Sequence, residues 1–153
     1  MQILEIADYS PEKLNLLISY LIDTNIAVYF MNGKFGLKEK IEEIQEPNCI
    51  FISEITLAEL KFGVEKSEKI ERNKQVLAKF LLDIQILPIA DSIDLYAREK
   101  ARLQKLGTPI NDFDLLIAVT SVTHILTMVT NNTKHFKNVQ QIKLEDWTIS
   151  SSL

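Results

Sequence analysis

Short apolar runs alternate with longer segments of helical periodicity along most of this 153-residue chain. Parallel strands need long crossover connections, usually helices, so the alternation predicts an α/β fold with a mainly parallel sheet. We expect strands at residues 20–23, 49–52, 85–88, 127–129 and 141–144. Helices are expected at residues 53–66 and 68–83, from Asp91 or Ser92 to Gly107, and from Asn111 or Asp112 to Thr123.

The first 18 residues precede the first expected strand. Within them Ser10 and Pro11 predict a short helix through Leu17, because serine is a favoured N-cap and proline suits the first helical position. We therefore expect an N-terminal extension at residues 1–18 and one domain at residues 19–150.

Three features bear on the cellular compartment. Glu5 and Asp8 interrupt the apolar run that a secretory signal needs. The longest uncharged stretch, after Asp114, contains too many polar residues for a membrane helix. A lone cysteine, Cys49, permits no disulfide within the chain and suits a reducing environment. The sequence thus predicts a cytoplasmic protein without a membrane partner.

The chain carries a formal net charge of −4 and has a pI near 5.2, so no overall attraction draws it to nucleic acid or to an anionic membrane. Its four glycines cannot supply the glycine-rich phosphate loops of dinucleotide-binding or P-loop proteins. A nucleic-acid function would therefore have to come from a local site.

Asp23 is the first candidate for such a site. It ends the apolar run YLID, and the carboxyl ends of strands are where open α/β sheets bind ligands. An aspartate in this position can equally be a helix N-cap or a turn residue.

Glu59 falls on the expected inward face of its helix, together with Ile55, Ala58 and Phe62. A carboxylate on a packed face must be paired, protonated or bound to a cation to offset its desolvation. The alternative is a buried glutamate paired with an arginine or lysine.

Asp114 lies in the first turn of a segment that is apolar nearly all round and is expected to be a buried helix. Capping explains one acidic residue there but not two. We expect Asp112 to be the simple cap and Asp114, which shares a face with Ile117 and Ala118, to point inward.

If these three carboxylates converge, only a cation makes their mutual repulsion tolerable. All-oxygen sites select hard ions such as Mg²⁺ or Mn²⁺, and such ions suit phosphoryl chemistry.

The motifs YLIDTNI, ISEITLAELKFGVEKS, YAREKARLQKLGTPI, DLLIA, VTNNTKHF and KLEDW, in this order over residues 19–147, resemble the PIN-domain ribonucleases, and within them the VapC-type toxins of type II toxin–antitoxin systems. The resemblance implies a three-layer α/β/α fold and an endoribonuclease dependent on one or two Mg²⁺ or Mn²⁺ ions. It assigns the catalytic, metal-binding positions to Asp23, Glu59 and Asp114.

The resemblance also implies supporting residues and partners. Thr24 and Thr130 would orient metal-bound water or phosphate, and Asp112 would act as an auxiliary acid. Where the family often has a further acidic residue, this chain has Asn131 and Asn132. A VapB-type antitoxin is the expected protein partner, and a homodimer is expected to form through residues 30–44 or the two-helix hairpin.

Arg98, Arg102 and Lys105 lie at i, i+4 and i+7 of one expected helix. This basic stripe could hold the RNA backbone, or it could be a solvated helix face.

Three alternatives remain open. The chain could be a metal-independent ribonuclease that uses His124 and His135 as acid and base. It could be a phosphoacceptor signalling domain, although the first expected strand ends in only one aspartate. It could also be a catalytically inactive PIN fold that binds RNA or protein.

Overall fold

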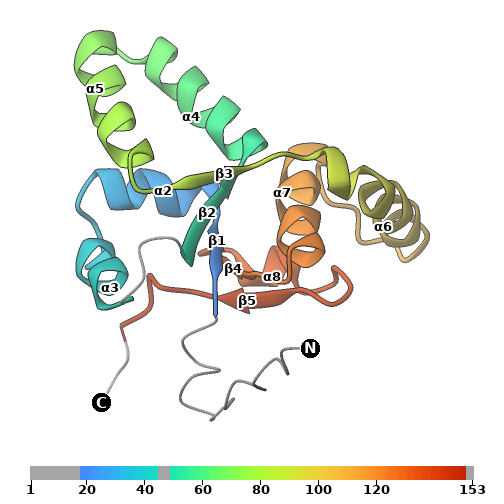
Figure 1. Ribbon diagram of the computed structural model, residues 1–153. Coiled ribbons are helices and arrows are strands. Elements are labelled where there is room, and N and C mark those ends of the chain that lie inside the picture. Colours follow the sequence, from blue (N-terminus) through green and yellow to red (C-terminus); the bar gives the residue numbers. More distant parts are fainter. Residues whose placement is uncertain (1–17, 45–48, 151–153) are drawn as a thin grey trace, which may run out of the picture.

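The computed structural model describes residues 18–44 and 49–150; the helix expected from Pro11 to Leu17 lies outside these residues. Five parallel strands form one sheet in the order β3-β2-β1-β4-β5 (Figure 1). The strands are β1 (Tyr20–Ile22), β2 (Ile50–Ser53), β3 (Gln85–Leu87), β4 (Thr127–Val129) and β5 (Lys143–Glu145). The predicted mainly parallel sheet is therefore confirmed, and every pairing observed is parallel.

The helices are α2 (Thr24–Met31), α3 (Leu37–Glu43), α4 (Glu54–Lys66), α5 (Ile70–Leu81), α6 (Ile93–Lys105), α7 (Asp112–Thr123) and α8 (Thr133–Phe136), with a 3₁₀ turn η2 (Ala90–Ser92) before α6. The four helices expected from periodicity are present with small shifts at their ends. The sequence did not predict α8, because four residues are too few to show a helical period.

Helices cover both faces of the sheet, which confirms the three-layer α/β/α fold (Figure 1). Side chains of successive strand residues point to opposite faces. In β1, Leu21 accordingly packs in one core cluster with residues of α6 and α7, and Ile22 packs in the other with residues of α2, α3 and α5. In β4, Met128 and Val129 divide in the same way.

Side-chain caps fix where the helices begin. Ser53 accepts a hydrogen bond from the Ile55 backbone N–H at 3.1 Å, as expected for α4. At α7 the cap is Asn111, whose side chain accepts from the Asp114 backbone N–H at 3.0 Å. Our choice of Asp112 as the cap was wrong, because Asp112 already belongs to the first helical turn.

The strand order places a topological switch point between β1 and β4. From β1 the chain builds the sheet toward β2 and β3, and β4 then adds on the other side. Ligands of open α/β sheets bind where the connections diverge in this way, at the carboxyl ends of the strands. Asp23 directly follows β1, and Thr130 directly follows β4.

No helix of the described residues is long and apolar enough to span a membrane.

Candidate functional site

Asp23 is a buried carboxylate at the switch point, with only 7% of its surface exposed. Its Oδ1 accepts from the Thr24 backbone N–H at 2.8 Å, so it caps α2, and its Oδ2 accepts from the Thr130 hydroxyl at 2.9 Å. Within the described residues no lysine, arginine or histidine forms a salt bridge with it. Burial raises the pKa of Asp23, the two hydrogen bonds oppose this rise, and the nearby Asp114 and Glu59 carboxylates add to it.

Glu59 approaches Asp23 through a shared neighbour, Thr24. The Thr24 hydroxyl donates to Glu59 Oε1 at 2.7 Å and lies 3.1 Å from the Thr56 hydroxyl. Thr24 therefore holds both carboxylates, one through its backbone N–H and the other through its side chain. The predicted alternative, a glutamate paired with arginine or lysine, is not observed, since no described basic residue bridges to Glu59.

The predicted inward face of α4 was correct for Ile55, which packs against the core, but wrong for Ala58 and Phe62. Thr56 and Leu60 are the buried residues of this helix, whereas Ala58 is exposed and Phe62 is 67% exposed. Helical spacing with Ile55 and Glu59 suggested that Phe62 faces the core, but the face that packs is set by positions 56 and 60. Glu59 lies beside this face and is half-buried.

Asp114 presents one carboxylate oxygen to two donors. Its Oδ2 accepts from Asn111 Nδ2 and lies 3.1 Å from His135 Nε2. The side chain is 31% exposed, while Ile117 and Ala118 on the same face of α7 are fully buried, as predicted.

The three predicted carboxylates thus lie close enough for Asp114 and Glu59 to raise the pKa of Asp23. No group of three or more histidine, cysteine, aspartate or glutamate side chains within residues 18–44 and 49–150 has the spacing of a formed metal centre. In this arrangement Thr24 engages Glu59, and Asn111 and His135 engage Asp114. An all-carboxylate donor set around a buried, unpaired aspartate suits a hard divalent cation.

Of the three predicted residues directly after β4, only Thr130 contacts one of the carboxylates. Thr130 is fully buried and donates to Asp23, while the Asn132 backbone N–H donates to the Thr130 hydroxyl at 3.1 Å. Asn131 is exposed, and its amide lies 3.5 Å from the Tyr29 hydroxyl. Neither asparagine side chain forms a hydrogen bond with Asp23, Glu59 or Asp114.

Asp112 is engaged away from the other carboxylates. Its Oδ1 accepts from Lys100 Nζ at 2.6 Å and from the Tyr96 hydroxyl at 2.7 Å. The hydrogen bonds from Lys100 and Tyr96 lower the pKa of Asp112. Asp112 therefore ties α7 to α6, and nothing in the structure supports an auxiliary role at the site.

The predicted basic stripe is only partly available. Arg102 forms two hydrogen bonds with Glu99, at 2.8 and 2.7 Å, and a third with the Asn138 carbonyl at 2.6 Å. Arg98 and Lys105 are exposed. Arg102 is thus engaged by contacts within the protein, and RNA contacts at Arg98, Arg102 and Lys105 stay a prediction.

His135 is the residue that sequence reasoning missed as a neighbour of the site. The sequence suggests His135 only as an acid or base of a metal-independent ribonuclease, and no motif connects it with Asp114. His124, the other candidate of that alternative, lies at the end of α7, and its buried Nε2 has no hydrogen-bond partner in the described part of the chain.

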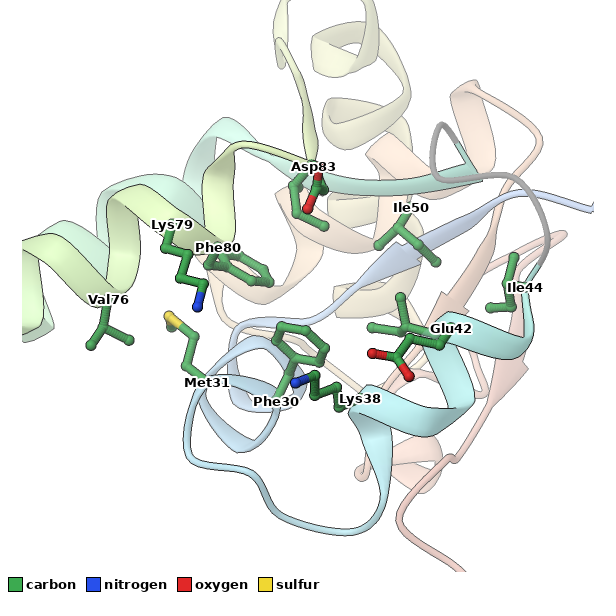
Figure 2. Close-up of a pocket in the computed structure, with 12 residues that line it drawn as sticks. Phe30, Met31, Lys38, Glu42, Ile44, Ile50, Val76, Lys79, Phe80 and Asp83 are labelled. Atoms are coloured by element: carbon green, nitrogen blue, oxygen red, sulfur yellow. The ribbon is translucent and has the colours of Figure 1, made fainter.

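A cavity of about 670 Å³ lies apart from these carboxylates. Figure 2 shows apolar side chains such as Phe30, Met31 and Phe80 around it, with charged groups at its margin. It lies between α2, α3 and α5, in the regions expected to supply homodimer contacts. A smaller cavity of about 260 Å³ is lined by Thr24 and Glu59 and therefore adjoins the site.

Fold and site together define a small parallel α/β protein with an acidic centre at the switch point of its sheet. The sequence matches the model of the PIN domain over residues 20–142. It is 38% identical over 130 residues to ribonuclease VapC2 of Rickettsia felis, covering 84% of this chain and 97% of that protein. The tRNA(fMet)-specific endonuclease VapC of Shigella flexneri is 33% identical over 134 residues, covering 86% of this chain and all of that protein.

The structure agrees with these sequence relationships. The crystal structure of VapBC2 from Rickettsia felis, bound to a DNA fragment from their promoter, superposes with a TM-score of 0.80 at 37% identity, covering 85% of this chain and 99% of that one. The chain belongs to the PIN domain family and, within it, to the VapC group.

Proposed function

We propose that this protein is a divalent-metal-dependent endoribonuclease and the toxin of a type II toxin–antitoxin pair. The observation that supports this most strongly is the Asp23 carboxylate, which is buried at the switch point, has no basic partner among the described residues and has a raised pKa. The relatives named as ribonucleases support RNA as the substrate class.

In this proposal Asp23, Glu59 and Asp114 hold one or two Mg²⁺ or Mn²⁺ ions. A bound divalent cation would activate water and offset the negative charge that develops on the scissile phosphate. Thr24 and Thr130 keep Asp23 and Glu59 in place through their hydrogen bonds. Arg98 and Lys105, and Arg102 beside them, are the candidates for contacts with the RNA backbone.

The expected protein partner is a VapB-type antitoxin, because the relative from Rickettsia felis was solved as VapBC2. An unpaired acidic centre is a natural binding site for an arginine of such a partner, since arginine pairs with carboxylates through two parallel hydrogen bonds. We further propose that the chain forms a homodimer in the cytoplasm.

Cleavage of RNA by the purified chain tests the proposed activity. Asp114→Asn should reduce Mn²⁺-dependent cleavage by more than about 100-fold, because it removes a proposed ligand. Asp112→Asn is the matched control, since it neutralises a carboxylate in the same helical turn that contacts Lys100 instead. Cleavage that survives EDTA would favour the histidine mechanism. If both variants cleave RNA as well as the wild type does, the assignment of Asp114 is refuted.

Expression in a bacterial host tests the toxin role. Induction of the chain alone should arrest growth, and co-expression of the antitoxin gene should restore it. Mapping of RNA 5′ ends after induction would then identify the cleaved RNA. Unchanged growth together with an unchanged RNA population would point to an inactive binding module.

A further inference from the structure

We propose that His135 is a positioning residue that orients the Asp114 carboxylate, so that Oδ1 of Asp114 is the atom offered to a cation. This inference rests on the metal site of the proposed function and adds a residue to it. His135 comes from α8, an element separate from the three that supply the carboxylates.

The His135 ring is held on two sides. Its Nε2 lies 3.1 Å from Asp114 Oδ2. It forms a T-shaped pair with the Phe136 ring, at 4.9 Å between centroids and an interplanar angle of 76°, and Phe136 is 1% exposed. A ring packed against a buried aromatic residue has little freedom to turn away from the carboxylate.

The proton on this contact can be assigned from chemistry. An ionised carboxylate only accepts hydrogen bonds, so the contact is attractive only when Nε2 carries a hydrogen. His135 is therefore the donor to Asp114, as histidines and other polar groups commonly are beside metal-binding carboxylates.

The two donors to Asp114 use the same oxygen. Asn111 Nδ2 and His135 Nε2 both contact Oδ2, and no described group donates a hydrogen bond to Oδ1. Asn111 belongs to the cap of the same helix and moves with Asp114. His135 is the donor from outside, so it fixes the carboxylate relative to the rest of the site.

The segment that carries His135 is also connected with Asp23. The His135 backbone N–H donates to the Asn132 carbonyl at 3.0 Å, the Asn132 N–H donates to the Thr130 hydroxyl, and Thr130 donates to Asp23. One continuous set of hydrogen bonds thus joins both aspartates. Loss of His135 should loosen the geometry of the pair rather than remove a ligand.

The experiment measures Mn²⁺ affinity of the purified, metal-free chain by calorimetry, without RNA. His135→Ala should weaken Mn²⁺ binding by about 10-fold or more, in the range seen when groups that orient metal ligands are removed. His135→Gln, whose amide can donate in place of Nε2, should remain within about threefold of the wild type. Lys134→Ala, an exposed neighbour on α8, is the control and should change nothing.

Wild-type affinity in His135→Ala would overturn the proposal, as would equal losses in the alanine and glutamine variants when both melt at the wild-type temperature. A second measurement needs no variant. The ¹⁵N spectrum of the wild-type imidazole should show a hydrogen on Nε2, and an Nε2 without hydrogen would overturn the assigned donor.

The outcomes separate this inference from the proposed activity. If the wild type binds Mn²⁺ but cleaves no RNA, the ribonuclease proposal fails while the affinity comparison still decides the role of His135. If the wild type binds no Mn²⁺, the metal site itself and the role of His135 both fail.

Discussion

The surroundings of two buried acidic residues, Glu99 and Asp23, shift their pKa values in opposite directions. Glu99, 3% exposed, receives two hydrogen bonds from Arg102, and these lower its pKa. Asp23 receives hydrogen bonds only from uncharged donors, and its pKa is raised. A buried carboxylate without a counter-ion costs stability, and such residues concentrate at functional sites. Because Asp23 lacks the charged partner that Glu99 has, we place the cation at Asp23.

Neutralising Asp23 should therefore stabilise the metal-free protein. A carboxyl group whose folded pKa lies above its ordinary value of 3.8 destabilises the fold at pH values above that folded pKa, where it is ionised. Asp23→Asn should raise Tm at pH 7 by a few degrees in EDTA, measured by calorimetry. The gain should shrink as the pH falls through the folded pKa and wild-type Asp23 becomes protonated.

The control for this prediction is Asp112→Asn, which should lower Tm at pH 7 instead of raising it. Hydrogen bonds from Lys100 and Tyr96 lower the pKa of Asp112, so its ionised form favours the fold at pH 7. Added Mn²⁺ should raise Tm of the wild type and of Asp112→Asn, because a ligand that binds only the folded state stabilises it, but not of Asp23→Asn. A lower Tm for Asp23→Asn in EDTA would contradict the account of Asp23.

Thr24 is the other residue whose chemistry can be isolated. Thr24→Val keeps the side-chain shape and the backbone N–H to Asp23 but removes the hydroxyl that donates to Glu59. We expect cleavage of RNA to fall by about 10-fold or more, as for other groups that orient a metal ligand. Thr24→Ser retains the hydroxyl and should keep most of the activity. Equal kinetics in all three proteins would show that the hydroxyl does not position Glu59.

At the scale of elements, Glu99 and Arg102 join α6 to the segment between α8 and β5. Glu99 Oε2 also accepts from the Gln140 backbone N–H at 3.0 Å, and Arg102 reaches the Asn138 carbonyl. This segment follows directly after α8, so the pair supports the element that carries His135. The role is structural and differs from the RNA contact that helical spacing suggested for Arg102.

Arg102→Ala should accordingly lower the free energy of unfolding, because it leaves the buried Glu99 carboxylate without its partner. Arg98→Ala, an exposed arginine on the same helix, should change stability by less than about 0.5 kcal/mol. Denaturant titration measures both. If Arg102→Ala leaves stability intact but weakens RNA binding, the sequence interpretation of the stripe would be restored.

The sequence predicted elements well where local signals were strong. Ser53 before a periodic segment marked the start of α4, and the alternation of strands and helices predicted the parallel sheet. It failed where packing decides. Phe62 is apolar but exposed, and the four residues of α8 are too few to show a helical period. The contact of His135 with Asp114 joins residues 21 positions apart and depends on the tertiary fold, so no local pattern could show it.

For the whole molecule, the net charge of −4 includes the three carboxylates of the proposed site. Without a cation this acidic centre repels a phosphate backbone. One bound divalent ion would reduce the charge of these three carboxylates from −3 to −1, and two ions would bring it to +1. The acidic composition is therefore compatible with an RNA substrate, provided that metal binds first.

RNA binding should depend on a divalent ion even when no cleavage occurs. Ca²⁺ binds oxygen ligands with looser geometry than Mg²⁺ and can be used to measure binding. Fluorescence anisotropy with a short labelled RNA should show affinity at least about 10-fold higher in Ca²⁺ than in EDTA, and Asp23→Asn should lose this increase. Equal affinity in both buffers would mean that a basic surface elsewhere binds the RNA.

The central claim is that Asp23, Glu59 and Asp114 together hold a divalent cation at the carboxyl ends of β1 and β4. Anomalous diffraction at the manganese edge from crystals soaked in Mn²⁺ tests it most directly. The account predicts a peak bounded by these three carboxylates, with Asp114 Oδ1 facing it, and no such peak in Asp23→Asn crystals. A manganese peak elsewhere, with none between these carboxylates, would contradict it.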